Sequence, residues 1–132
     1  MNFIKLGLLI LISSCITAKA SPSWNYLYSM YEVQTGEKFS NTYVDINTIK
    51  ISNGKLNLWT KYDFNGKTQL GAQGGMEHLI VDCTNRQTTI LALVNIKDGV
   101  ISQPTNSMAP DDWIPGSDTE VLGEKFCNRY NH

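Results

Sequence analysis

The segment KLNLWTKYDF, residues 55–64, alternates apolar and polar side chains more regularly than any other part of the chain. In an extended strand, one face would carry Leu56, Leu58, Thr60, Tyr62 and Phe64, and the opposite face Asn57, Trp59, Lys61 and Asp63. Asn-Gly pairs at 53–54 and 65–66 flank the segment, and this dipeptide tolerates the positive φ angles that a type I′ hairpin turn needs. A strand between two such turns pairs with antiparallel neighbours, so the segment indicates an antiparallel sheet.

Other stretches have the composition of short strands, namely residues 23–33, residues 38–51 with a kink near 45–48, and the apolar segments 76–83 and 87–96. A turn at Asp98-Gly99 precedes a further short strand over 100–103. The three glycines within residues 69–76 predict a loop or a frayed strand end. Residues 103–116 contain three prolines and no periodicity, which indicates a long connection.

The C-terminal residues predict one helix. Ser117 is a favourable N-cap, and Glu120 completes a capping box in which each side chain bonds a free backbone N–H of the other residue. Leu122, Phe126 and Tyr130 fall on one helical stripe, and Gly123 beside them permits close approach to the sheet. The predicted fold is therefore α+β, a small antiparallel sheet of about six strands packed against one C-terminal α-helix in a single domain over residues 21–132.

Residues 1–20 have the layout of a secretory signal peptide, with Lys5, an apolar run over 6–12 and the small-residue ending Ala18-Lys19-Ala20. The apolar run is too short to span a bilayer. The pattern predicts cleavage between Ala20 and Ser21 and export out of the cytoplasm. In an alternative interpretation, ISSC at 12–15 is a bacterial lipobox, and a lipid on Cys15 anchors the domain through a tether over residues 16–23.

Cys83 and Cys127 remain once Cys15 is assigned to the N-terminal segment. In an oxidising compartment such a pair is interpreted first as a disulfide, with two buried free thiols as the alternative. A zinc site is disfavoured, because zinc needs four ligands and His78 and the terminal His132 are the candidates that could join two thiolates.

Beyond residue 20 the chain is mildly acidic. Lys5 and Lys19 account for two of the eleven Lys and Arg residues, so nine basic residues face twelve acidic ones and the net charge is −3. These basic residues are isolated from one another along the sequence. Nucleic acid is therefore a disfavoured partner, because the phosphate backbone demands a concentrated positive surface.

The sequence shows no pattern typical of a catalytic centre. His78 is the strongest candidate base, but on a strand it shares a face with Asp82 while Glu77 points to the other face, so the three form no relay. The pair Asp111-Asp112 lacks the alternating oxygen ligands of a calcium loop. We therefore expect no enzymatic activity, no bound metal and no cofactor.

Trp59 and Trp113 are candidate partner contacts, because aromatic side chains anchor many protein interfaces. The alternative for Trp113 is packing under the 103–116 connection. For Trp59 the alternatives are burial on the face opposite Leu58 and a contact within a homodimer. An outer sheet edge or the glycine-rich residues 70–75 are places where a partner strand could add.

The order of several short motifs resembles a known family. The motifs are Trp24, YVD at 43–45, NLWTKYDF at 57–64, IVDC at 80–83, the Trp-x-Pro-Gly-Ser block from Trp113 to Glu120, and Cys127. Together they resemble the surface-adhesin E family of bacterial envelope proteins. The resemblance implies a sheet of about six strands on a C-terminal helix, a Cys83–Cys127 pair, and export to the envelope.

For function, the resemblance implies adhesion to host extracellular-matrix and plasma proteins, as in the founding type of the family. The first hypothesis is thus a binding module that holds a protein partner. The second is a periplasmic inhibitor or accessory factor, for example of a host lysozyme-type hydrolase, a role that small disulfide-closed β domains often have.

Overall fold

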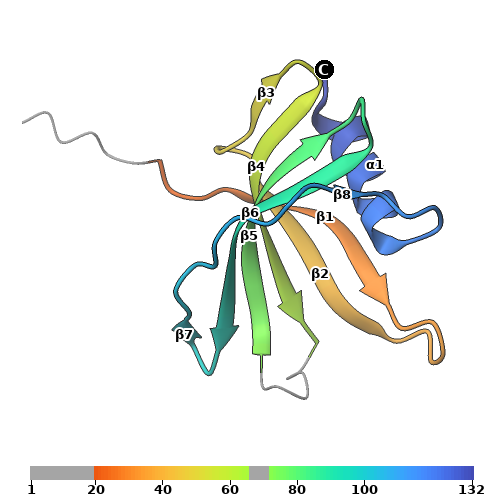
Figure 1. Ribbon diagram of the computed structural model, residues 1–132. Helices are drawn as coiled ribbons and strands as arrows, with labels where there is room; N and C mark the ends of the chain where they lie inside the picture. The colour runs from red at the N-terminus through yellow and green to blue at the C-terminus, as the bar shows by residue number, and fades with distance from the viewer. Residues whose placement is uncertain (1–19, 66–71) are drawn as a thin grey trace, which may run out of the picture.

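The computed structural model describes residues 20–65 and 72–132. Its elements are β1 (Trp24–Tyr31), β2 (Lys38–Asp45), β3 (Lys50–Ser52), β4 (Lys55–Phe64), β5 (Ala72–Asp82), β6 (Gln87–Lys97), β7 (Val100–Ile101), β8 (Asp111–Asp112) and α1 (Asp118–Tyr130). The strands form a twisted sheet, and α1 packs on one side of it (Figure 1). The predicted α+β fold with one C-terminal helix is confirmed.

The sheet is antiparallel at each of its described pairings, in the order β1-β2-β4-β5-β6-β7, with β3 beside β4 and β8 beside β6. Two of the predicted turns have the expected backbone. Asn53 and Gly54 have φ angles of 51° and 72°, and Asp98 and Gly99 have 51° and 75°. The turn predicted at 65–66 extends outside the described residues.

The kink predicted near 45–48 separates β2 from β3. The Asp45 carboxylate accepts the backbone N–H of Asn47 at 3.1 Å, and the Asp45 carbonyl accepts the hydroxyl of Thr48 at 2.8 Å. These local bonds replace strand pairing, which is the usual effect of an Asp side chain in a turn.

The glycine-rich stretch differs from its predicted structure. Gly74 and Gly75 lie inside β5, paired with Asp63 and Tyr62. A β-carbon on Gly75 would lie 2.7 Å from both the Tyr62 hydroxyl and the Val94 carbonyl. These groups can approach β5 so closely only because Gly75 has no side chain. Of the two predicted alternatives, the loop was wrong for these glycines, whereas a strand end agrees with their place near the start of β5; residues 66–71 lie outside the described part of the chain.

Helix α1 begins as predicted, with one difference in its cap. The Ser117 hydroxyl accepts the N–H of Glu120 at 3.3 Å. The Glu120 carboxylate accepts the N–H of Gly116 at 3.1 Å, because the N–H of Ser117 is already donated to the Ile114 carbonyl at 3.0 Å. The reciprocal bond of the capping box is therefore shifted by one residue.

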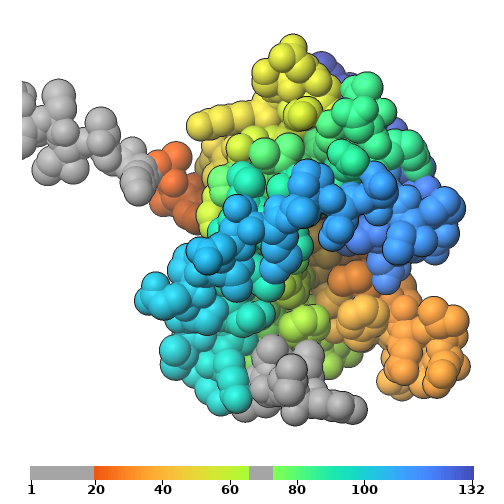
Figure 2. All heavy atoms as spheres, viewed as in Figure 1, coloured from red at the N-terminus to blue at the C-terminus, as the bar shows by residue number. Residues whose placement is uncertain are grey.

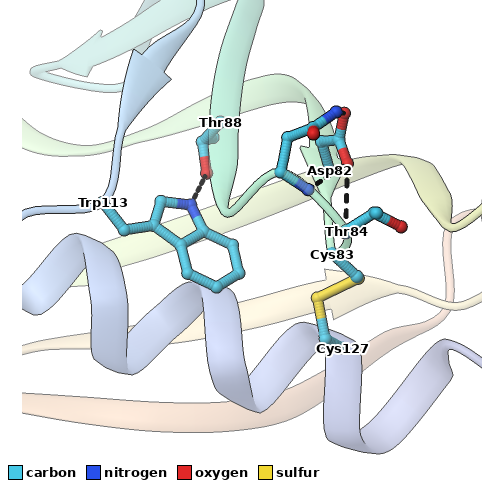
Figure 3. Close-up of a disulfide and its surroundings, with 7 residues drawn as sticks. Asp82, Cys83, Thr84, Thr88, Trp113 and Cys127 are labelled. Carbon is cyan, nitrogen blue, oxygen red and sulfur yellow. Dashed lines mark hydrogen bonds between the residues drawn. A yellow bond between two sulfur atoms is a disulfide. The ribbon is translucent and has the colours of Figure 1, made fainter.

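A disulfide between Cys83 and Cys127 joins the end of β5 to α1 (Figure 3). Trp113 lies over the same helix with 7 % of its surface exposed, and its ring N–H donates to the Thr88 hydroxyl at 2.8 Å. A β-carbon on Gly123 would overlap three carbons of the Trp113 ring. The close approach that Gly123 permits is therefore to Trp113, whereas the sequence predicted an approach to the sheet.

Two arginines hold α1 to the sheet from outside the core. Arg86 bonds the carboxylates of Glu120 at 2.8 Å and Glu124 at 3.0 Å, and its guanidinium lies 5.0 Å from the centre of the Trp113 ring. Arg129, near the other end of α1, donates to the Tyr26 carbonyl at 2.8 Å. Because these pairs are exposed, they orient the helix more than they stabilise it.

The helix-facing side of the sheet has two unequal halves. The filled half, next to Cys83, consists of Leu56, Leu58, Leu79 and Val81, none more than 4 % exposed. The hollow half lies further along β4 and β5 and on the neighbouring β2. It has the smaller Thr42, Thr60 and Gly75, with Glu77, beside the larger Tyr62 and Phe64, and its two threonines are as buried as the leucines of the filled half. Phe126 packs with the filled half in the main core and, with Leu79, also borders the space that Thr42 and Thr60 leave below α1.

Candidate functional site

The face of the sheet opposite α1 carries a group of aromatic and basic side chains, which we call the outer face. Its members are Trp24, Tyr26, Tyr43, Trp59, Lys61 and His78. At its centre, Trp59 on β4 pairs across the strands with His78 on β5, and the two rings stack with centroids 4.9 Å apart and an interplanar angle of 8°. The alternation in residues 55–64 predicted this placement of Trp59, and the register with β5 supplies its partner.

The stack continues toward β1 through Lys61. The ammonium group of Lys61 lies 5.4 Å from the centre of the Trp24 ring and 5.2 Å from that of Tyr43. Tyr43 contacts Tyr26 edge to face at 6.1 Å, and Tyr26 is 51 % exposed. The Lys61 ammonium also lies 4.0 Å from the Asp63 carboxylate, so this region offers aromatic area together with a lysine that is held by two rings and by an ion pair.

His78 has the environment of a structural residue. Its Nε2 atom lies 2.7 Å from the side-chain oxygen of Asn57, and burial, followed by the nearby charge of Lys50, lowers its pKa. A neutral imidazole suits its stacking on Trp59. The predicted separation of Glu77 from His78 is observed, since Glu77 lies on the helix-facing side.

Asp82 stabilises a turn at the end of β5. Its carboxylate accepts the backbone N–H groups of Thr84 at 3.1 Å and Asn85 at 2.9 Å, and the side-chain amide of Asn85 at 2.9 Å (Figure 3). These bonds from Asn85, with a smaller effect of Lys55, lower the pKa of Asp82. The carboxylate is used to shape the turn before Arg86.

The hollow half forms one wall of a cavity of about 350 Å³ between α1 and the sheet. Tyr62 and Glu77 both line it. Burial raises the pKa of Glu77 and, together with the Glu77 charge, raises the pKa of Tyr62 to about 12. Sequence reasoning missed this cavity, although small residues at two inward positions of neighbouring strands, Thr42 and Thr60, are a signal for it.

Trp113 and the two aspartates before it have structural roles in the domain. Trp113, near the end of the 103–116 connection, is buried against Gly123 of α1, so its ring is not offered at the surface; the alternative interpretation expected burial, but under the connection itself. Asp111 and Asp112 form β8 on the edge of β6, and Asp112 accepts a bond from Gln87 at 2.8 Å. In the described ranges, no group of three or more His, Cys, Asp or Glu side chains is arranged to hold a metal ion.

The β6 edge of the sheet is covered by the connection that follows β7. The N–H groups of Ser102, Thr105 and Met108 donate to the carbonyls of Asn95, Leu93 and Ile90, respectively, at 2.8–3.0 Å. Figure 2 shows this connection, in lighter blue, crossing the front of the molecule toward α1. Addition of a partner strand at this edge would have to displace it.

Comparison with known proteins adds a family to this geometry. The family model described as surface-adhesin protein E matches residues 30–128. The chain belongs to the surface-adhesin protein E family. No curated protein matches the chain.

Two solved structures share the fold. One is protein E of Haemophilus influenzae in its selenomethionine form, with a TM-score of 0.54, 14 % identity, and coverage of 85 % of this chain and 95 % of that one. The other is protein E from non-typeable Haemophilus influenzae, with a TM-score of 0.51, 15 % identity, and coverage of 84 % and 88 %. At an identity of 14–15 %, this likeness shows that the fold is shared and shows nothing further.

Membership in a surface-adhesin family supports an adhesin role, a protein partner and a location at the cell envelope or surface, and it favours binding over catalysis. Among the described residues, no helix is both long enough and apolar enough to cross a membrane. Cys15, the candidate for lipidation, lies outside the described residues.

Proposed function

We propose that this protein is an exported envelope adhesin that binds a host extracellular-matrix or plasma protein through its outer face. The observation that carries the proposal is the stack of Trp59 on His78, continued by Lys61 between Trp24 and Tyr43, on the side of the sheet that α1 leaves uncovered. Aromatic side chains with neighbouring cationic groups are the residues on which binding energy concentrates in protein interfaces.

The other candidate surfaces are less accessible to a partner than the outer face. Trp113 is buried, and the β6 edge is covered by its own chain, so neither is available without rearrangement. The outer face is held on both sides of Trp59, since Trp59 pairs with His78 of β5 and its backbone N–H donates to the Thr48 hydroxyl at 3.1 Å. A rigid surface loses little conformational entropy when it binds.

The test is binding of the purified domain, residues 21–132, to immobilised vitronectin and laminin at physiological salt. Trp59→Ala is expected to weaken binding by about 2 kcal/mol, roughly thirtyfold in Kd, as expected for a central aromatic contact. Tyr31→Ala is the matched control, because Tyr31 is 56 % exposed at the end of β1, away from the Trp59–His78 stack. Equal binding by both variants, or no saturable binding to either matrix protein, would contradict the proposal.

A second copy of the chain is another occupant that the outer face could accept. The mass of the domain in solution separates the two cases. A monomer that binds a matrix protein supports the proposal. A dimer that Trp59→Ala converts to a monomer would instead assign the outer face to self-association.

For export, we propose cleavage between Ala20 and Ser21. The support is that the folded domain already engages Ser21, whose carbonyl accepts the side-chain amide of Asn47 at 2.8 Å, and Ser23, whose N–H donates to Asp45 at 2.9 Å. The lipid-anchored alternative expected a tether over residues 16–23. Because Ser21 and Ser23 are bonded to the domain, a tether would instead end before Ser21. The mass of the mature protein from cells decides the matter, since a free Ser21 supports this cleavage and acyl chains on Cys15 would replace it with lipid anchoring.

A further inference from the structure

The cavity below α1 is distinct from the surface proposed for adhesion, because it lies on the opposite side of the sheet. Its volume of about 350 Å³ falls within the range of small-molecule sites. It exists because of the sequence of the hollow half: Thr42 faces Tyr62 across β2 and β4, and Thr60 faces Glu77 across β4 and β5. Leucine and valine occupy the corresponding positions of the filled half.

The walls of the cavity are mostly apolar and come from both layers. The sheet contributes Met30, Phe64, Leu79 and Ile90, and the helix contributes Leu122 and Phe126. An alkyl chain placed among these side chains would remove their apolar surface and its own from water, which is the main source of affinity in such sites.

The charged side chains that line the cavity are acidic. Glu77 lines it from β5, and Asp118 lines it from the first turn of α1. The described residues that line the cavity include no lysine, arginine or histidine. Burial raises the pKa of Glu77, which shows that its negative charge is poorly solvated and would be stabilised by a cation placed beside it.

We propose that this cavity binds a small amphiphile that consists of an apolar chain and a cationic end, with the chain between α1 and the sheet and the cation beside Glu77. A neutral hydroxyl in place of the cation keeps the chain contacts and loses the charge interaction. An anionic end at the same position lies beside the Glu77 carboxylate and is disfavoured by charge repulsion.

Three probes with the same chain test the sign of charge, namely octylamine, octanol and octanoate. Each is titrated below its aggregation concentration into the ¹⁵N-labelled domain, and the amide shifts of Leu122, Gly123 and Phe126 are followed. The expected result is saturable shifts at these residues, with the tightest binding for octylamine, weaker binding for octanol and the weakest for octanoate. Octanoate binding as tightly as octylamine, or shifts confined to the outer face, would overturn the proposal.

Matched variants test the location. Thr60→Leu adds carbons inside the cavity and is expected to abolish octylamine binding, whereas Thr89→Leu makes the same change on the outer side of the sheet, where Thr89 pairs with Ile80, and leaves binding unchanged. Glu77→Gln is expected to weaken octylamine binding about tenfold and octanol binding less than about twofold, since the lost interaction is a charged one.

Dispersed amide spectra for each variant confirm folding before binding is measured. A folded Thr60→Leu protein that binds octylamine like the unchanged domain would place the ligand elsewhere. Because Trp59→Ala leaves the cavity intact, it should retain octylamine binding even if matrix binding is lost, so the adhesin proposal and this one can fail separately.

Discussion

The filled half and the hollow half of the helix-facing sheet lie on the same strands, yet they have different physical roles. Leu56, Leu58, Leu79 and Val81 pack against Phe126 in the core beside the Cys83–Cys127 disulfide. Along the same β4 and β5, Thr60 and Glu77 face a cavity. The comparison indicates that the layer is closely packed near the disulfide and borders a cavity in its other half, so we expect truncations to cost more stability near the disulfide.

The largest effect is expected from the disulfide that closes the filled half. Replacing Cys83 and Cys127 together by serine frees a loop with a sequence separation of 44 residues. The unfolded chain then gains entropy worth roughly 4 kcal/mol. Urea unfolding of the double variant, with the oxidised domain as reference, measures the loss. A loss below about 1 kcal/mol would contradict the expectation that the disulfide is a main source of the stability of the domain.

Truncation of the filled half comes next. Leu58 is fully buried, so Leu58→Ala is expected to cost about 3 kcal/mol through lost apolar burial and the new cavity. Thr60, two residues along the same face, is also fully buried but borders the cavity, so Thr60→Ala removes fewer apolar contacts and is expected to cost less than about 1 kcal/mol. Urea unfolding of both variants measures the two losses of unfolding free energy. Equal losses would contradict the distinction between the filled half and the hollow half.

The contact between Gly123 and Trp113 allows a sharper test of how α1 is fixed. Gly123→Ala improves helix propensity by about 1 kcal/mol but places a methyl group against the Trp113 ring, and the expected balance is a net loss of about 1–2 kcal/mol. In a Trp113→Ala background the same change should become stabilising. Thermal unfolding of the four proteins completes a double-mutant cycle, and an unchanged sign in the second background would mean that the ring does not limit this position.

The smallest effects concern two carboxylates of β5 whose pKa values move in opposite directions. Burial raises the pKa of Glu77, so the stability of its protonated form is present at low pH and is lost as pH rises through the raised pKa. Hydrogen bonds from Asn85 lower the pKa of Asp82, so its contribution is present above the ordinary carboxyl pKa and is lost as pH falls through the lowered value.

Unfolding free energies between about pH 2 and pH 7 test these signs. Relative to the unchanged domain, Glu77→Gln should gain stability as pH rises above the ordinary carboxyl pKa, whereas Asp82→Asn should lose stability as pH rises from about 2 toward that ordinary pKa. The same direction of change for both variants would contradict the opposite environments assigned to the two groups.

Several parts of the fold could be predicted because local physics decides them. The alternation in residues 55–64 gave the faces of β4, the Asn-Gly and Asp-Gly pairs gave two turns, and Ser117 gave the start of α1. The resemblance and the number of cysteines gave the Cys83–Cys127 pair. Each of these signals lies within a few residues or follows from the chemistry of one residue type.

What the sequence did not reveal depends on contacts between distant segments. Gly74 and Gly75 belong to a strand because Tyr62 and Val94 crowd that position from neighbouring strands. Gly123 faces Trp113, ten residues earlier, and Trp59 meets His78 only through the register of β4 with β5. The cavity is the clearest case, since Thr60 is an ordinary inward strand residue until the position of α1 is known.

The most direct test of the hollow half is the unfolding free energy of Thr60→Leu. A leucine at this position adds apolar carbons where the structure has open space, so the variant should be as stable as the unchanged domain or more stable, by up to about 1 kcal/mol. If the side chains were instead closely packed, overpacking would cost about 1–3 kcal/mol, and that result would contradict the existence of the cavity.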